Sequence, residues 1–348
     1  MSRRPRRRAS LAVTAVAAAV ASLAAPAVVA APAGAAVVAA TAGATVLAAP
    51  VRARVVAPAP SHTVVRAGTE RVLLALGDSL AAGYQPTYGT HAPPLDPATG
   101  YPDTGYPGGY AADIASARHL TLVDLACPGE TTVSMTTVPA KAACATTYRG
   151  ELGATSQLRA ATSFLARHKG AVALVTLDLG ANDVDGCVSA SGISSSCLAT
   201  RQARVVARLP AIVAAIRAAL SADDPGARLV AMNYYDPFLG VAYSPGGLVG
   251  TVGATLSLAA TTAFDRRLGA LFAHARVPVA NVAAAFHTYA ALPLLVYAGH
   301  RLPANVVYVC RWTWMCPTSG SSSHADIHAT TAGYRVIAAA FERILGPA

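Results

Sequence analysis

Five short apolar runs recur along the chain, and longer amphipathic stretches separate them. The runs are residues 71–76, 120–125, 172–179, 228–234 and 277–284. Their apolar character is continuous rather than alternating, which is typical of strands that are buried on both faces of a parallel sheet. The pattern therefore predicts five parallel strands.

The stretches between the runs show helical periodicity. One apolar stripe consists of Val205, Leu209, Ile212, Val213, Ile216 and Leu220, and Pro210 within it marks a kink or a fresh start. A second stripe near the C-terminus consists of Tyr334, Ile337, Phe341, Ile344 and Leu345, and Gly346-Pro347 ends that helix. Strands that alternate with helices predict an α/β fold, in which helices cover both faces of the sheet.

Four long inserts interrupt this alternation. They comprise residues 85–107, 131–150, 243–253 and 298–323. Loops of this length inside a compact domain are usually functional or disordered. We therefore expect irregular segments that contribute to a site.

The first 69 residues have a composition of their own. A basic segment, Arg3 to Arg8, precedes an apolar run, and the small residues Ala33-Gly34-Ala35 fit a signal-peptidase site. No charged residue lies between Arg8 and Arg52, so a retained membrane anchor is the alternative. Cleavage is favoured because alanine dominates the run and contributes little transfer energy. We expect a signal peptide at residues 1–35, an Ala-, Pro- and Val-rich linker or propeptide at 36–69, and one folded domain at 70–348.

The net charge of +10 comes mostly from this leader. Of the 27 Lys and Arg residues, eight arginines precede the first acidic residue, Glu70, which leaves 19 basic and 17 acidic groups in the remainder. A near-neutral body without a basic stripe argues against a nucleic-acid partner. It also gives no reason to expect an anionic polymer as substrate.

Six cysteines fit an exported protein with three disulfides. They are Cys127, Cys144, Cys187, Cys197, Cys310 and Cys316. Six cysteines allow 15 pairings, but these lie in three local couples with 16, 9 and 5 intervening residues, so sequential pairing is expected. A zinc site is disfavoured because the chain has no Cys-x-x-Cys with matching histidines.

Polar or small residues follow three of the predicted strands. Gly77-Asp78-Ser79-Leu80 follows the first, Cys127-Pro128-Gly129-Glu130 the second and Gly180-Ala181-Asn182-Asp183 the third. Ligands bind outside the carboxyl ends of parallel strands, so a serine nucleophile at the first strand is well placed. Each motif alone is a weak signal, and a tight turn is its simplest explanation. Their recurrence in one order is more specific.

With these motifs the chain resembles the secreted SGNH/GDSL serine hydrolases of actinobacterial type. The matching blocks are Gly77-Asp78-Ser79-Leu80, Gly129, Gly180-Ala181-Asn182-Asp183 and the C-terminal His328, within residues 71–345. The resemblance implies a flavodoxin-like three-layer α/β/α sandwich with strand order 2-1-3-4-5. It also implies that Ser79 is the nucleophile and His328 the general base. The backbone N–H groups of Ser79 and Gly129 and the side chain of Asn182 would form the oxyanion hole.

The third member of the triad departs from the family pattern. The family's aspartate usually lies three residues before the histidine, where this chain has Ala325, and the usual proline after the histidine is replaced by Ala329. Either Asp326 orients His328 through an altered turn, or a backbone carbonyl near residues 323–325 does so. His324 is the rival imidazole, and we interpret it as a solvated loop residue.

Other residues near the motifs have two interpretations. Asp78 and Asp183 resemble the paired carboxylates of a glycosidase, but aspartates beside turns more commonly fix the local backbone, which is the interpretation we favour. Trp312 and Trp314 either line a substrate groove or pack against the short Cys310–Cys316 loop.

Together these features predict an exported serine esterase or lipase that acts through an acyl-Ser79 intermediate without a metal or organic cofactor. Apolar loops favour a lipid-like ester as substrate, with transient contact to a lipid surface and a monomeric state. One alternative is a carbohydrate O-acetylesterase with a smaller acyl pocket. The other is a secreted, non-catalytic binding module with a decayed triad.

Overall fold

The computed structural model describes residues 71–86, 108–189, 192–243, 248–316 and 325–347. The expected signal peptide, the linker, most of the 85–107 insert and His324 lie outside these residues. The boundaries expected at residues 35 and 69 therefore stay predictions.

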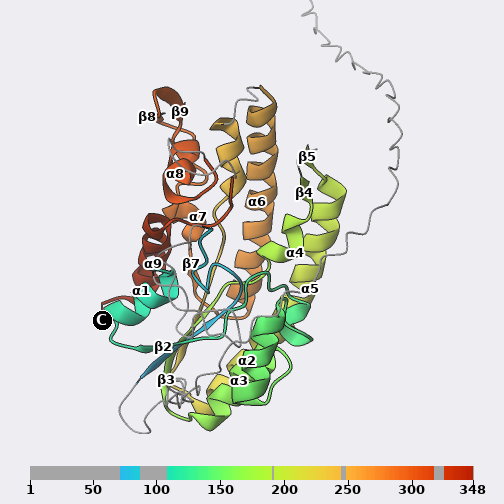
Figure 1. Cartoon of the computed structure of the whole chain (residues 1–348), viewed down its shortest axis with the longest axis vertical. Coiled ribbons are helices and arrows are strands. Elements are labelled where there is room, and N and C mark those ends of the chain that lie inside the picture. The colour runs from blue at the N-terminus through green and yellow to red at the C-terminus, as the bar shows by residue number, and fades with distance from the viewer. Residues whose placement is uncertain (1–70, 87–107, 190–191, 244–247, 317–324, 348) are drawn as a thin grey trace, which may run out of the picture. The chain divides into compact units, whose positions relative to one another are not determined.

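A five-stranded parallel sheet lies at the centre of the described domain (Figure 1). Its strand order is β2-β1-β3-β6-β7. Its strands are β1 Val72–Leu76, β2 Thr121–Asp124, β3 Val172–Leu177, β6 Arg228–Met232 and β7 Val279–Ala280. Each strand lies within the apolar run that predicted it. If only these five strands are numbered along the chain, their order in the sheet is 2-1-3-4-5, which confirms the expected topology.

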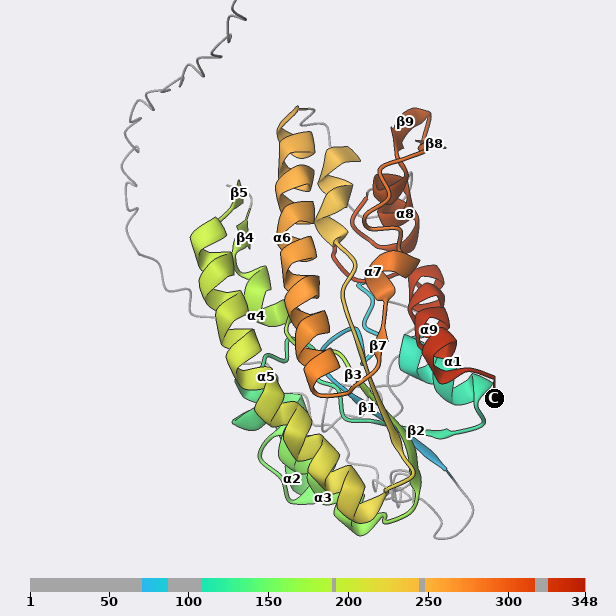
Figure 2. The same cartoon turned by 180° about the vertical axis from the view of Figure 1, so that it is seen from behind.

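Helices cover both faces of the sheet. Figures 1 and 2 show α1 (Tyr110–Ala117) and α9 (Thr331–Leu345) on one side and α3 (Gln157–Arg167) and α5 (Ser195–Asp223) on the other. The two helices of each pair pack against each other. This arrangement is the α/β/α sandwich that the sequence predicted.

The core is built around β1, whose five residues are fully buried. β1 lies between β2 and β3, so neighbouring strands protect both of its edges. β2 differs from the expectation, because its residues are only partly buried. It is the edge strand of the sheet, with a single neighbour.

α5 buries the whole stripe that predicted it. Its six apolar positions are at most 5% exposed, and Pro210 lies inside one continuous helix rather than starting a new one. Among the described residues, α5 is the one helix long and apolar enough to span a membrane by length and composition. Its six stripe residues belong to the hydrophobic core of the domain.

Three of the inserts were wrongly expected to be irregular. Residues 131–150 contain η1 (Ser134–Thr136) and most of α2 (Ala142–Leu152), and residues 243–253 contain the start of α6 (Leu248–His274). Residues 298–323 contain β9 (His300–Pro303), which pairs with β8 (Leu294–Tyr297), and α8 (Ala304–Trp312). The start of α6 was hard to recognise in the sequence because it contains glycine, which disfavours a helix. A Cβ on Gly250 would lie 2.4 Å from the carbonyl oxygen of Val241, so glycine lets α6 pack closely on the segment that carries Val241.

Candidate active site

Ser79 lies in the turn that follows β1, and its residue is 8% exposed. Gly77 begins this turn with a φ of 138°, a conformation that side chains disfavour. A Cβ at Gly77 would lie 1.7 Å from Oδ1 of Asp178. Gln157 of α3 bonds both backbone polar groups of Gly77: its Oε1 accepts from the N–H of Gly77 (2.7 Å), and its Nε2 donates to the Gly77 carbonyl (2.9 Å). The turn is therefore fixed from inside the core.

Asp178 supports the Ser79 turn, although the sequence interpretation did not single it out. It is fully buried beyond the end of β3, where Oδ1 accepts the N–H of Asp78 (2.8 Å) and Oδ2 accepts the hydroxyl of Tyr110 (3.3 Å). Burial raises the pKa of Asp178 to about 7. Burial and the charge of Asp178 also raise the pKa of Asp78. The available signal was a lone acidic residue inside the apolar run 172–179.

His328 lies in the loop just before α9 and reaches Ser79. Its Nε2 is 2.8 Å from Oγ of Ser79, and its Nδ1 is 2.6 Å from Oδ1 of Asp326. The same Oδ1 accepts the backbone N–H of His328 (2.8 Å). This local turn lets an aspartate two residues before the histidine reach the imidazole. The structure thus brings the carboxylate of Asp326 to Nδ1.

Hydrogen bonds keep the Asp326 carboxyl in its ionised form. Partial burial favours the neutral acid, but the hydrogen bonds from the side chain and backbone of His328 outweigh burial and lower the pKa of Asp326. An ionised carboxylate at Nδ1 fixes the tautomer that leaves Nε2 free to accept a proton.

The loop that carries His328, residues 325–330, pairs with the segment that follows α8. The N–H of Trp314 donates to the carbonyl of His328 (3.0 Å), and the N–H of Asp326 donates to the carbonyl of Trp314 (3.0 Å). On the other side, the hydroxyl of Tyr235 donates to the carbonyl of Ile327 (2.7 Å). The ring of Tyr84 packs edge-on against the imidazole, with centroids 4.6 Å apart.

The two tryptophans make different contacts. Trp312 stacks on Tyr308 and meets Phe286 edge-on. Trp314 donates its indole N–H to Oε1 of Gln85 (3.3 Å). Neither lines the cavity beside Ser79.

The expected oxyanion-hole residues come from the two neighbouring strand ends. Gly129 follows β2 with a φ of 85°. Asn182 lies in α4 (Ala181–Asp185), and its Nδ2 donates to the carbonyl of Glu130 (3.1 Å). Asn182 also lines the same cavity as Ser79 and His328.

The carboxylates of Asp78 and Asp183 hold nearby backbone in place, which is the interpretation that the sequence favoured. Oδ1 of Asp78 accepts the N–H of Leu80 (2.9 Å). Asp183 accepts the N–H (2.8 Å) and the hydroxyl (2.6 Å) of Thr132, which ties the loop after β2 to α4.

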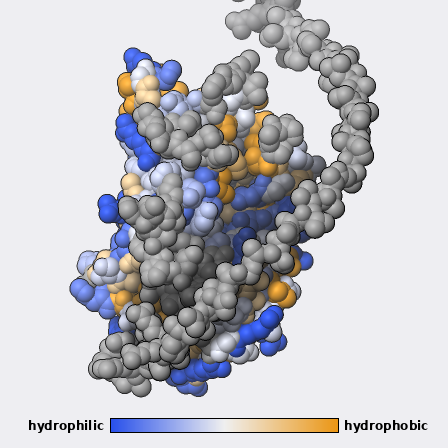
Figure 3. Space-filling view, viewed as in Figure 1, coloured by the Kyte–Doolittle hydropathy of each residue, from blue (hydrophilic) through white to orange (hydrophobic). Residues whose placement is uncertain are grey.

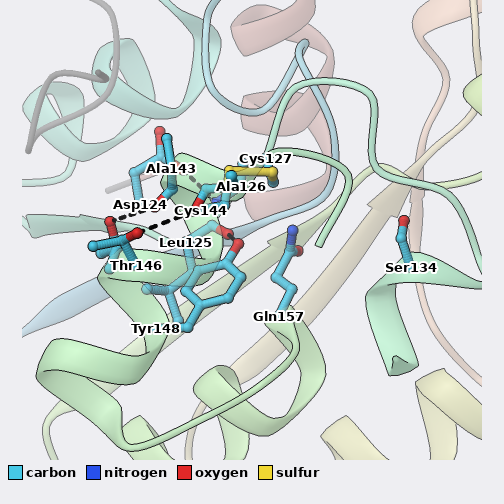
Figure 4. Close-up of a disulfide and its surroundings, with 12 residues drawn as sticks. Asp124, Leu125, Ala126, Cys127, Ser134, Ala143, Cys144, Thr146, Tyr148 and Gln157 are labelled. Atoms are coloured by element: carbon cyan, nitrogen blue, oxygen red, sulfur yellow. Dashed lines mark hydrogen bonds between the residues drawn. A yellow bond between two sulfur atoms is a disulfide. The ribbon is translucent and has the colours of Figure 1, made fainter. Parts of the chain in front are cut away.

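The cysteines pair sequentially, as expected, and each disulfide lies beside one part of the site. Cys127–Cys144 joins the loop that carries Gly129 to α2, and in Figure 4 it lies beside Tyr148. Cys187–Cys197 joins the end of α4 to the start of α5, and Cys310–Cys316 links α8 to the end of the segment that pairs with the His328 loop. Among the described residues, no cluster of three or more His, Cys, Asp or Glu side chains is arranged to hold a metal ion.

A cavity of about 810 Å³, including its opening to solvent, extends from Ser79 and His328. Its walls are mainly apolar and come from the β4–β5 hairpin (Val188–Ser189 and Gly192–Ile193), α5, η2 (Pro237–Tyr243) and α6. Figure 3 shows apolar surface gathered over α6 and the β4–β5 hairpin. Asp185, which the sequence interpretation missed, lines the cavity, and burial raises its pKa to about 6.

Solved structures similar to this chain include three ester-cleaving enzymes by name. Phospholipase A1 of Streptomyces albidoflavus is 21% identical, with a TM-score of 0.46 over 80% of this chain and 98% of that one. The extracellular lipase of Streptomyces rimosus is 21% identical, with a TM-score of 0.45 over 78% and 99%. An aryl esterase of M. smegmatis is 15% identical, with a TM-score of 0.41 over 79% and 98%.

Family membership rests on the sequence match. No curated protein sequence matches the chain significantly. The GDSL-like lipase/acylhydrolase family, by contrast, matches residues 75–336, which include Ser79, Gly129, Asn182 and His328. This match covers most of the chain and all of the strand ends that form the site. The chain therefore belongs to the GDSL-like lipase/acylhydrolase family.

Proposed function

We propose that this hydrolase cleaves carboxylic esters through an acyl-Ser79 intermediate. One observation carries the proposal: Ser79, His328 and Asp326 form a continuous hydrogen-bonded row at the wall of a mainly apolar cavity. A nucleophile, a base and an orienting carboxylate in this order are what acyl transfer to serine requires.

His328 moves the proton in each half of the reaction. As Oγ of Ser79 attacks the ester carbonyl, Nε2 accepts the hydroxyl proton and then returns it to the leaving alkoxide. A water molecule then takes the place of the alcohol and attacks the acyl carbon while Nε2 accepts its proton. As the bond to Oγ breaks and the acid leaves, Nε2 returns that proton to Ser79. During both steps the carboxylate of Asp326 stabilises the imidazolium through Nδ1.

The backbone N–H groups of Ser79 and Gly129 and the amide of Asn182 stabilise the oxyanion. The hydrogen bond from Asn182 to the carbonyl of Glu130 supports this role, because it uses one amide hydrogen and fixes the direction of the other. Loss of one such donor typically costs about 2.7–4 kcal/mol in the transition state.

The lining of the cavity favours a lipid-like ester. Val188, Ile193, Leu198, Phe238 and Phe264 give an acyl chain longer than acetyl an apolar environment, which a carbohydrate O-acetylesterase does not need. The complete hydrogen-bonded row speaks against a decayed binding module. This chemistry needs no cofactor. Three disulfides and the arginine-led apolar leader support export of the enzyme.

The test is hydrolysis of aryl esters of increasing acyl length by the purified protein and by Ser79→Ala. We expect Ser79→Ala to lose at least about 10³-fold in kcat. Ser221→Ala, which removes the hydroxyl of an exposed serine on α5, is the matched control and should keep full activity. Equal rates for Ser79→Ala and the parent would refute the serine mechanism, and a maximum at acetyl would refute the lipid-ester preference.

A further inference from the structure

The hairpin formed by β8 and β9 stands outside the central sheet and has a well-defined turn. Ala298 and Gly299 join the two strands, with φ values of 48° and 82°. Two successive residues with positive φ are typical of a type I′ turn, whose twist matches that of the flanking strands. Leu294 pairs with Pro303 and Tyr297 with His300, so the register is fixed at both ends.

One face of this hairpin packs on the domain. Tyr297 and Leu302 are half-buried against the cluster formed by Val306 and the Cys310–Cys316 disulfide. The hydroxyl of Tyr297 also donates to the carbonyl of Cys310 (3.4 Å). This inner face holds the hairpin on α8.

The opposite face exposes large apolar side chains. Leu292, Leu294 and Val296 alternate along the chain and are 75%, 45% and 62% exposed. Residues two apart on a strand point to the same side, so at least Leu294 and Val296 share the outer face. Contiguous exposed apolar groups of this size mark a binding surface more often than isolated ones do.

Positive charge lies on the same face. Val296 pairs directly with the exposed Arg301, which therefore shares its face. A second arginine, Arg311 of α8, lies beside the strand, because its Nη2 donates to the carbonyl of Val296 (3.4 Å). No Asp or Glu occurs anywhere in the sequence from residue 266 to residue 325. A partner for this face therefore has to accept apolar side chains and carry negative charge.

We propose that the outer face of the β8–β9 hairpin, defined by Leu294, Val296 and Arg301, docks on an anionic lipid surface together with the adjoining exposed Leu292. Apolar side chains enter the boundary between headgroups and acyl chains, while arginines reach the lipid phosphates. This inference rests on the proposed lipid-ester function, which gives the enzyme a reason to bind such a surface.

The hairpin connects directly to the site. β9 leads into α8, and the residues after α8 pair with the loop that carries His328. Figures 1 and 2 show the hairpin at the end of the domain beyond α8 and α7 (Val282–Ala285), away from β1 and β2. Figure 3 shows apolar and hydrophilic surface side by side at this end.

The experiment compares binding of the full chain to two kinds of vesicle, one of phosphatidylcholine alone and one of equal parts phosphatidylcholine and phosphatidylglycerol. The test variant carries Leu292→Ser, Leu294→Ser and Val296→Ser. Val138→Ser is the matched control, because Val138 is 60% exposed but lies between η1 and α2. All proteins keep the same N-terminus, so the apolar leader contributes equally to each.

We expect the triple variant to bind the mixed vesicles at least about tenfold more weakly than the parent. Arg301→Gln should weaken binding to the mixed vesicles only, and Val138→Ser should change neither. In a Val296→Trp protein, brominated lipids should quench the added fluorescence. Unchanged vesicle binding by the triple variant, or an added indole signal that brominated lipids do not quench, would overturn the proposal.

Two controls separate this proposal from the proposed function. Ser79→Ala should bind vesicles like the parent while hydrolysing nothing, and the triple variant should still hydrolyse a water-soluble aryl ester. If the parent binds the mixed vesicles but hydrolyses no ester, the proposed function fails and the docking surface stands. If the parent is a dimer, and the triple variant is a monomer that still binds vesicles like the parent, the exposed strand pairs with a second copy and the lipid proposal is wrong.

Discussion

The Ser79 turn and the His328 loop meet at a single hydrogen bond, but different forces hold them. The turn is part of the core: buried side chains of Gln157 and Asp178 bond its backbone, and Gly77 leaves no room for a Cβ. The loop lies closer to the surface and is held by pairing with the segment after α8 and by tyrosine contacts. The position of the nucleophile thus depends on buried core groups, whereas the position of the base depends on loop pairing and tyrosine contacts nearer the surface.

The carboxyl groups on the two sides also have opposite pKa shifts. Burial raises the pKa of Asp178, beneath the turn, to about 7. At Asp326, hydrogen bonds from His328 outweigh partial burial and lower the pKa. Burial therefore shifts Asp178 towards its neutral form, and hydrogen bonding shifts Asp326 towards its charged form, as an orienting carboxylate requires.

The sharpest way to break the turn is Gly77→Ala. The new Cβ would lie 1.7 Å from Oδ1 and 2.1 Å from the carbonyl oxygen of Asp178, on a backbone with a φ of 138°. We expect a loss of more than about 4 kcal/mol in the free energy of unfolding, measured in urea, or failure to fold. Gly150→Ala is the control, because a Cβ there meets no atom within 4 Å; it should be neutral or slightly stabilising. Similar stability of the two variants would show that the turn is not fixed by the core.

On the other side, Asp326→Asn should affect catalysis and leave the fold intact. An asparagine Oδ1 can still accept the N–H of His328, but the amide does not stabilise an imidazolium. We expect kcat to fall by about 10²–10⁴-fold, with little change in KM or in the free energy of unfolding. A rate within a few-fold of the parent would assign the orienting role to a group other than Asp326.

The two regions also differ in what the sequence could predict. The strand order and the Ser79 turn followed from continuous apolar runs that end in small or polar residues, because a buried strand leaves a local signature. The orienting group of His328 stayed open between Asp326 and a backbone carbonyl. It depends on backbone pairing between the His328 loop and Trp314, a contact between two separate segments that leaves no local pattern in the sequence.

Two further features were beyond the sequence for related reasons. Asp178 bonds the Ser79 turn and Asp185 lines the cavity, and both roles depend on neighbours in space. In the sequence each is only an acidic residue near a motif. The 298–323 insert was expected to be irregular because a short hairpin and a nine-residue helix carry weak periodic signals. Its alternation of exposed and inward residues became clear only once the register of β8 and β9 was known.

The raised pKa of Asp178 predicts that Asp178→Asn alters the pH dependence of stability. In the unfolded chain this carboxyl ionises near 3.8, and in the folded protein near 7. Between these values the unfolded state releases a proton that the folded state keeps, so stability is fully present below the lower value and is lost as pH rises towards 7. An amide at this position does not ionise and removes that loss. We expect the fall in unfolding free energy between about pH 4 and pH 7 to shrink by roughly 2–4 kcal/mol. An unchanged slope in urea titrations would place the proton on another group.

The smallest expected effect comes from Tyr235→Phe, which separates tyrosine support of the His328 loop from backbone pairing. The change removes the 2.7 Å hydrogen bond to the carbonyl of Ile327 and keeps the ring stacked on Phe286, with centroids 4.2 Å apart. Stability should fall by about 1 kcal/mol. Because Ile327 adjoins His328, the imidazole gains freedom, and kcat should fall by roughly 2–10-fold.

Tyr297→Phe is the matched control for this prediction, since it also removes a hydroxyl that donates to a carbonyl, that of Cys310, without touching the His328 loop. Its kcat on a water-soluble aryl ester should equal that of the parent. If both Phe variants keep the parent rate, backbone pairing with Trp314 alone positions the base. The His328 loop would then be nearly as firmly fixed as the Ser79 turn, and the contrast between the two regions would reduce to the difference in their carboxyl groups.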